Sequence, residues 1–125
     1  GDPVMQREIT PYHVEKILEL LKELQKIDPE FPLQYSICLA EIALNEGLSL
    51  TELSKKTDLS ISTVSRIVGA LSDFRKNNRP YGLVKLTTSE TERRRKALHL
   101  TPKGRQLLIT ISTGLDANSK AQKSA

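Results

Sequence analysis

The sequence has few cysteines and no long apolar run. Its 125 residues include a single cysteine, Cys38, which excludes an internal disulfide framework and fits a reducing, cytoplasmic setting. No stretch of about 18 apolar residues is present, so we expect no membrane-spanning segment, and no charged-then-apolar signal peptide leads the chain. The length suits one modest hydrophobic core, which predicts a single domain.

Signatures of catalysis and metal binding are also missing. The sequence has neither G-x-x-x-x-G-K nor G-x-S-x-G, the motifs of phosphate-binding loops and hydrolase nucleophiles. His13 and His99 fall on different predicted elements, and neither has a metal-ligand spacing to Cys38. We therefore expect no enzyme, no metal site and no cofactor, with His13 at the surface and His99 a candidate phosphate contact. Cys38 is predicted to be a buried hydrophobe; the alternative, a peroxide-sensing thiol, would need a nearby basic cluster.

The charge of the chain is unevenly distributed. The net charge is only +4, but residues 48–105 hold 13 Lys and Arg against 5 Asp and Glu, whereas residues 1–47 hold 4 against 9. Such an asymmetry is expected when one half of a protein faces phosphates and the other half faces elsewhere.

The segment from Ser49 to Phe74 predicts two short helices joined by a tight turn. Ser49 and Glu52 have the S-x-x-E spacing of a capping box. Asp58 is expected in the turn, because aspartate tolerates the left-handed conformation, and Ser60 is the expected N-cap of the second helix. The buried face of that helix is predicted from its apolar spacing: Val64, Ile67, Val68, Leu71 and Phe74.

The opposite face of the second helix carries hydroxyl groups and one guanidinium. Arginine can donate two hydrogen bonds to a guanine edge, and serine or threonine can bond base edges or phosphates. An ordinary solvated helix face is the alternative interpretation. We predict that this face enters the major groove of DNA through Ser62, Thr63, Ser65 and Arg66.

A β-hairpin with an arginine-rich tip is predicted after this helix, with strands at 83–87 and 96–100. Its tip residues would reach phosphates or a narrow minor groove, whose negative potential attracts arginine. A charged edge that resists aggregation is the alternative. The wing residues are Arg93, Arg94, Arg95 and Lys96. We predict that a further set of basic residues contacts the phosphates of the DNA backbone: Lys55, Lys56, Arg75, Lys76 and Arg79.

Three further helices are predicted, at 10–27, 33–46 and 102–116. A threonine followed by a proline opens the first and the last of them, which is the order of an N-cap and a first helical residue. The first has a wider apolar stripe than one core face requires, which favours a second subunit as its partner. The stripe consists of Val14, Ile17, Leu18, Leu20, Leu21, Leu24 and Ile27.

These elements, in this order, make a winged helix-turn-helix, which is mainly α with a small β-hairpin wing. The chain resembles the multiple antibiotic resistance regulator (MarR) family of bacterial transcription factors over about Leu33 to Leu108, most specifically at STVSRIV, GLV and LTPKGRQLL. The resemblance implies a homodimeric, sequence-specific regulator, a repressor that binds a palindromic operator on double-stranded DNA. It also implies a pocket for a small-molecule effector between the dimerisation and DNA-binding parts, although nothing in the sequence identifies one.

In that family an acidic wing residue orients an arginine toward the minor groove. Counting back from Leu100 places this pair on Glu92 and Arg94, with glutamate where aspartate is usual. The link from Leu71 to Gly82 is longer than the family's usual link, as it is in similar phage and prophage members. The resemblance therefore extends to the phage and prophage members of the family, which implies a phage or prophage origin for this chain.

The DNA-binding domain is expected to span residues 10–116, with dimerisation through its first and last helices. Residues 1–9 are expected to be flexible, residues 1–4 to be an expression remnant before Met5, and residues 117–125 to fray. A winged helix that docks another protein is the alternative function. It would need an exposed apolar patch in place of the wing arginines, and its binding would depend little on salt.

Overall fold

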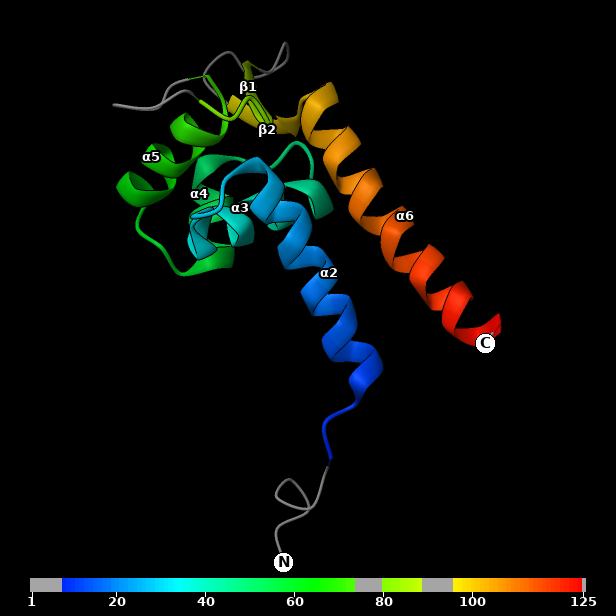
Figure 1. Cartoon of the computed structure of the whole chain (residues 1–125). Helices are drawn as coiled ribbons and strands as arrows, with labels where there is room; N and C mark the ends of the chain where they lie inside the picture. Colours follow the sequence, from blue (N-terminus) through cyan, green and yellow to red (C-terminus); the bar gives the residue numbers. More distant parts are fainter. Residues whose placement is uncertain (1–7, 74–79, 89–95, 125) are drawn as a thin grey trace, which may run out of the picture. The chain divides into compact units, whose positions relative to one another are not determined.

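The computed structural model describes residues 8–73, 80–88 and 96–124, with side chains through residue 113. Five helices and a two-stranded hairpin follow one another in these ranges (Figure 1). The chain divides into one unit of residues 1–30 and 110–125 and a second unit of residues 31–109. The elements are α2 (Pro11–Ile27), α3 (Leu33–Leu44), α4 (Leu50–Thr57), α5 (Ile61–Leu71), β1 (Val84–Thr88), β2 (Lys96–Leu100) and α6 (Pro102–Ser124).

The helix pair α4 and α5 forms as its capping residues predict. The Glu52 amide donates to Ser49 Oγ at 3.1 Å and the Ser49 amide to Glu52 Oε1 at 3.3 Å, which completes the capping box. Asp58 has φ 59°, so the tight turn is the left-handed one expected of an aspartate. Ser60 Oγ accepts from the Thr63 amide at 3.2 Å. All three local predictions are confirmed.

One face of α5 packs into the core of the second unit. The predicted inward positions Val64, Ile67, Val68 and Leu71 are buried, while Phe74 lies outside the described residues. The other almost fully buried side chains come from α3, α4 and the hairpin region: Cys38, Ile42, Leu53, Leu83, Val84 and Leu98. Because one face of α5 is packed on several elements, its opposite face is fixed toward solvent.

The hairpin is a two-stranded antiparallel sheet that is also tied to the segment before α4. β1 pairs with β2 in the register Val84↔Leu100 through Thr88↔Lys96. On the other edge of β2, the Gly47 amide donates to the Leu98 carbonyl at 2.7 Å, and the Leu98 amide donates to the Leu48 carbonyl at 2.9 Å. Both edges of β2 are therefore hydrogen-bonded around Leu98, its middle residue, which anchors the hairpin to the segment before α4.

The carboxyl end of α5 is closed by residues 81–83 rather than by its own next turn. The amides of Tyr81, Gly82 and Leu83 donate to the carbonyls of Ala70, Ser72 and Leu71 at 3.1, 2.8 and 2.7 Å. Leu83 is thereby engaged with α5, which is why β1 begins one residue later than the strand predicted at 83–87. The last carbonyls of a helix need such partners.

The first two helices begin where predicted and α2 also ends at Ile27 as predicted, but the N-cap of α2 and the end of α3 differ from the prediction. Thr10 occupies the N-cap of α2, yet its side chain makes no cap hydrogen bond, and its carbonyl accepts from the amides of His13 and Val14. α3 ends at Leu44, two residues before the predicted end at 46, because Asn45 leaves the helical conformation with φ −137° and ψ 52°. Neither difference changes the order of the elements.

The last helix is longer than predicted. Thr101 opens it as expected, since its Oγ1 accepts from the Gly104 amide at 3.0 Å. α6 then continues to Ser124, whereas the prediction ended it at 116 and had residues 117–125 fray. Residues 117–124 contain neither proline nor glycine and include the helix formers alanine, lysine and glutamine, so the continuation has a local cause.

Candidate nucleic-acid interface

The first two turns of α5 present polar side chains to solvent. Of the four residues predicted to read bases, Ser62, Ser65 and Arg66 are exposed and Thr63 is half-buried. Ser60 Oγ lies 3.1 Å from Ser62 Oγ and donates to Thr63 Oγ1 at 2.9 Å. Thr63 therefore belongs to the cap of the helix as well as to its outer face, a role that the spacing of residues did not indicate.

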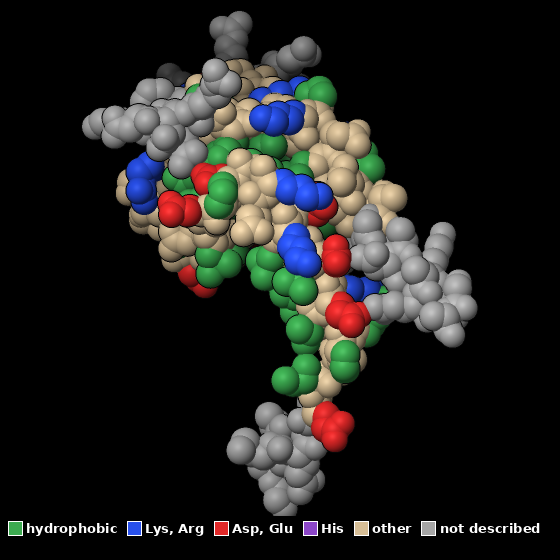
Figure 2. Space-filling view, in the orientation of Figure 1, with side chains coloured by type: hydrophobic (Ala, Val, Ile, Leu, Met, Phe, Trp, Pro, Cys, Tyr) green, Lys and Arg blue, Asp and Glu red, His purple; other side chains and the backbone are tan. Residues whose placement is uncertain are grey.

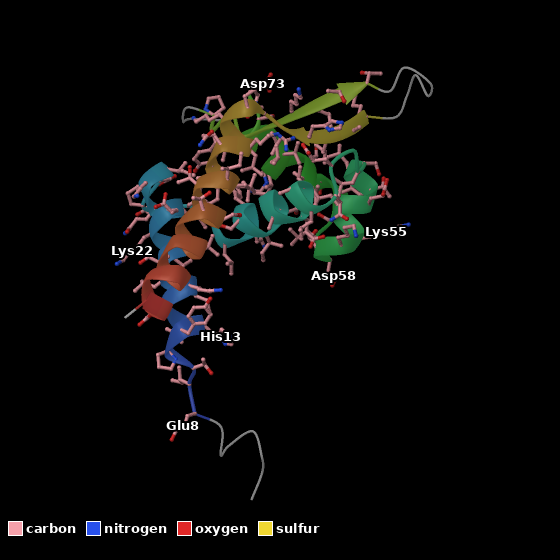
Figure 3. All side chains as sticks on the ribbon, turned by 90° about the vertical axis from the view of Figure 1, so that its right-hand side faces the viewer. Glu8, His13, Lys22, Lys55, Asp58 and Asp73 are labelled. Atoms are coloured by element: carbon pink, nitrogen blue, oxygen red, sulfur yellow. The ribbon has the colours of Figure 1, made fainter. Side chains whose placement is uncertain are left out.

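Two other elements of the second unit carry exposed lysines. Lys55 and Lys56 are exposed in the last turn of α4, where the helix dipole favours cations, and Lys55 projects away from the helix (Figure 3). Lys96 is exposed at the start of β2. The other predicted contacts, Arg75, Lys76, Arg79, Glu92, Arg93, Arg94 and Arg95, lie outside the described residues.

The hairpin contributes a cation that sequence reasoning did not single out. Lys85 is exposed on β1 and pairs directly with His99 on β2. Cross-strand partners share one face of a sheet, so Lys85 joins the histidine that was a candidate phosphate contact. A prediction of the register between the two strands would have identified Lys85 as the partner of His99. Lys103 is different, because its Nζ donates to the Tyr81 carbonyl at 2.9 Å and so supports the backbone beside the hairpin.

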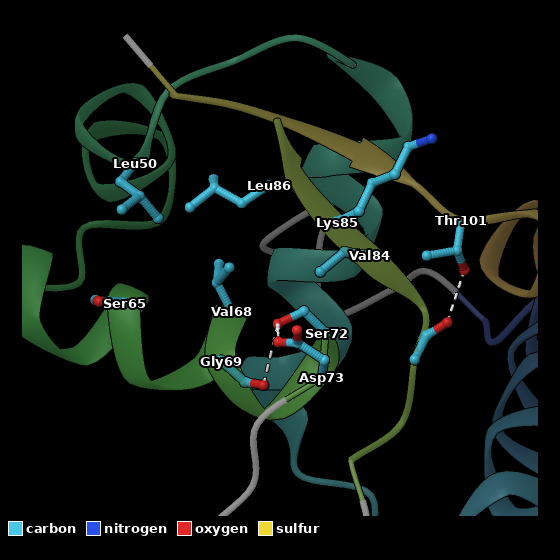
Figure 4. Close-up of a pocket in the computed structure, with 11 residues that line it drawn as sticks. Leu50, Ser65, Val68, Gly69, Ser72, Asp73, Val84, Lys85, Leu86 and Thr101 are labelled. Carbon is cyan, nitrogen blue, oxygen red and sulfur yellow. Dashed lines mark hydrogen bonds between the residues drawn. The ribbon is translucent and has the colours of Figure 1, made fainter. Parts of the chain in front are cut away.

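A pocket of about 490 Å³ lies between α5, β1 and the start of α4 (Figure 4). Its walls are largely apolar, and its volume is in the range of sites that bind small molecules. It lies within the second unit, and Ser65 of the predicted base-reading face is one of its lining residues. The lining residues are Leu50, Ser65, Val68, Gly69, Ser72, Asp73, Gly82, Val84, Lys85, Leu86 and Thr101.

The described residues offer little for chemistry. They contain no group of three or more His, Cys, Asp or Glu side chains that could hold a metal ion. Among the described helices, none is both long and apolar enough to cross a membrane. Cys38 is fully buried, and burial, with a smaller contribution from the nearby Glu41 carboxylate, raises its pKa to about 11. The thiol is therefore held in its neutral form at neutral pH, as expected of a hydrophobic residue in the core.

We expect the Cys38 thiol of the folded chain to resist alkylation. At pH 8 iodoacetamide should alkylate Cys38 at least about a hundredfold more slowly in the folded chain than in the denatured chain. The raised pKa lowers the fraction of reactive thiolate, and burial keeps the reagent from the sulfur. Mass spectrometry against time measures both rates. Equal rates in the two conditions would contradict the buried assignment.

Comparison with known proteins agrees with this geometry. A family model described as winged helix-turn-helix DNA-binding matches residues 39–73, which include α4 and α5. A putative transcriptional regulatory protein for the hcr operon of Thauera aromatica is 38% identical over 73 residues. The match covers 58% of this chain but only 40% of that relative.

Two solved structures show the same arrangement of elements. The S. aureus MepR–DNA complex matches with a TM-score of 0.69 and 18% identity, over 90% of this chain and 85% of that one. A MarR-family transcriptional regulator from Silicibacter pomeroyi matches with a TM-score of 0.54 and 20% identity, over 90% and 69%. At these identities the likeness establishes the fold.

The chain is therefore a winged helix-turn-helix protein, and the prediction of that fold is confirmed. The solved structures with this fold include one described as MarR and one described as a transcriptional regulator of the MarR family, the family that the sequence resembles.

Proposed function

We propose that this chain is a sequence-specific, double-stranded DNA-binding regulator of transcription that acts in the cytoplasm as a homodimeric repressor. One observation carries the proposal: α5 exposes Ser62, Ser65 and Arg66 while its other face is buried in the core. The relatives support it, since MepR was solved bound to DNA and the Thauera aromatica protein is described as a transcriptional regulatory protein.

The dimensions of α5 suit the major groove of B-DNA. An α-helix with its side chains is roughly 10 to 12 Å across and the groove is about 12 Å wide, while the 11 residues of α5 give roughly 16 Å of helix to lie along it. In helix-turn-helix proteins the amino-terminal residues of the second helix contact base edges, which here are the exposed ones. Lys55, Lys56 and Lys96 would bind phosphates and fix the position of the helix without reading sequence.

The proposed dimer rests on the surface of α2. Four apolar side chains in the i, i+3, i+4, i+7 pattern of one helix face are about half exposed on this helix: Val14 at 47%, Ile17 at 56%, Leu18 at 47% and Leu21 at 52%. Figure 2 shows hydrophobic side chains at the surface of the molecule. Such a stripe is typical of an interface between subunits. A two-fold dimer would bind a palindromic operator with half-sites about 34 Å apart, and repress by occluding the promoter.

Placing a charge on this stripe should separate the subunits. We expect Leu21→Glu to shift the chain from dimer to monomer at micromolar concentration, because an unpaired carboxylate would be buried in the interface. Sedimentation velocity measures the mass. Lys22→Gln changes the net charge by the same amount at an exposed position about a quarter turn around α2 from the stripe, so it is the matched control and should remain dimeric. A monomeric wild-type chain would remove the dimer from the proposal.

Salt dependence tests DNA binding against the docking of a protein. Fluorescence anisotropy with a labelled random-sequence duplex should give an affinity that falls by about three orders of magnitude between 50 and 200 mM salt, as expected for about six phosphate contacts. The same titration with Lys55→Ala and Lys56→Ala together should give a shallower slope. No binding at 50 mM salt would refute the proposed function.

A small-molecule effector is a second part of the proposal, and the position of the pocket favours it. Ser65 lines the pocket and also belongs to the face proposed to read bases. An occupant of the pocket would therefore compete with DNA directly. Its chemistry would be mainly apolar, because Leu50, Val68 and Leu86 form much of the lining.

A further inference from the structure

The carboxylate of Glu46 joins three segments of the unit formed by residues 31–109. Glu46 lies between α3 and α4. Its Oε1 accepts a hydrogen bond from the Leu100 amide at 2.9 Å, at the last residue of β2. Arg105 Nη2, in the first turn of α6, donates to Oε1 at 2.8 Å and to Oε2 at 2.7 Å. The hydrogen bonds from Arg105 and from the Leu100 amide lower the pKa of Glu46, which is therefore ionised at neutral pH.

Other hydrogen bonds fix the same end of the hairpin. The Thr101 amide donates to the Leu83 carbonyl at 3.0 Å, and Thr101 Oγ1 donates to the Gly82 carbonyl at 2.7 Å. These bonds tie the start of α6 to the start of β1. Glu46 bonds both the end of β2 and α6, and it acts together with the backbone bonds of Gly47 and Leu48 to Leu98, which hold the middle of β2 to the same segment.

The ion pair between Glu46 and Arg105 contributes little to the free energy of folding. The side chains of Glu46 and Arg105 are 28% and 54% exposed, and ion pairs at such positions are weak stabilisers in water. Its position has a larger effect. Because Gly47 and Leu48 hold β2 at Leu98, a change at Leu100 would turn the strand about Leu98. Lys96 is two residues from Leu98, roughly 7 Å away, so a turn of about 10° would move it by about 1 Å.

We propose that Glu46 is a positioning residue for DNA binding, which holds the hairpin at the angle where Lys96 reaches the duplex while α5 occupies the major groove. The inference rests on the proposed function. It assigns to Glu46 an effect on where the hairpin contacts DNA, separate from any effect on whether the domain folds.

Three variants separate the bonds of Glu46. Glu46→Ala removes all of them, Glu46→Gln keeps an acceptor for the Leu100 amide, and Arg105→Ala keeps that acceptor but removes the ion pair. Glu23→Ala is the matched control, because it removes another surface ion pair, with Lys26 at 2.8 Å, from the face of α2 opposite its exposed apolar stripe. Thermal unfolding of each variant reports any general loss of stability.

The footprint on a duplex selected from a random pool by the wild-type chain tests the proposal. Dimethyl sulfate reports guanine N7 in the major groove, and hydroxyl radicals report the minor groove. We expect Glu46→Ala to bind about tenfold more weakly and to lose the flanking minor-groove protection while keeping the major-groove protection. Glu46→Gln should retain more of the minor-groove protection, and Glu23→Ala should match the wild type.

Two outcomes would overturn the proposal. One is an unchanged footprint and affinity for Glu46→Ala. The other is a parallel loss of both protections that follows the loss of thermal stability, since that would make the role of Glu46 structural only. A wild-type chain that selects no duplex would instead refute the proposed function, so the two failures can be told apart.

Discussion

Replacing Arg66 by alanine is expected to abolish discrimination at one base pair of the operator half-site. Arg66 is exposed on the first two turns of α5, where a guanidinium can donate two hydrogen bonds to guanine O6 and N7. The loss should be about 1 to 3 kcal/mol against the preferred base, or roughly 5- to 150-fold in affinity. Competition binding with duplexes substituted at each position measures it.

Two controls separate base reading from charge. Arg66→Lys keeps the positive charge but loses the planar pair of donors, so it should resemble Arg66→Ala in specificity. Lys56→Ala removes an exposed cation from α4 and should weaken binding to all duplexes by a similar factor. If Arg66→Ala behaves as Lys56→Ala is expected to, then Arg66 contacts phosphate and does not read a base.

Replacing Gly104 by alanine is expected to destabilise the domain, although alanine favours helices by about 1 kcal/mol over glycine. A Cβ at position 104 would overlap the carbonyl oxygen of Leu83 and lie 2.9 Å from its carbonyl carbon. That oxygen also accepts the Thr101 amide, so α6 cannot move away without losing the bond. We expect a loss of about 3 kcal/mol, and a fall in Tm of about 10 °C or more.

Ser112→Ala, on the same helix at an exposed position, is the control for helix propensity and should leave Tm unchanged or slightly raised. Circular dichroism against temperature compares the two variants. A Gly104→Ala protein as stable as the wild type would show that α6 and Leu83 are less closely packed than the structure has them.

The features that could be predicted from the sequence are those set by neighbours along the chain. Ser49 with Glu52 caps α4, Asp58 makes the turn and Ser60 caps α5, because each acts on residues within three positions. The buried face of α5 follows from its apolar spacing in the same way.

The features that could not be predicted depend on residues far apart in the chain. Glu46 and Arg105 are 59 positions apart, and nothing near either indicates the other. The closure of α5 by residues 81–83 and the close approach of Gly104 to Leu83 likewise arise only when the chain has folded. The predicted contacts at Arg75, Lys76, Arg79 and Arg93 to Arg95 stay predictions, because they lie outside the described residues.

The central claim is that the exposed face of α5 reads DNA sequence. Selection of duplexes from a random pool by the wild-type chain, followed by footprinting of the enriched sequence, tests it most directly. We expect a two-fold symmetric motif with half-sites about 34 Å apart, whose guanines are protected in the major groove and lose that protection in Arg66→Ala. Enrichment of no motif, or of a motif whose protection is the same in wild type and Arg66→Ala, would contradict it.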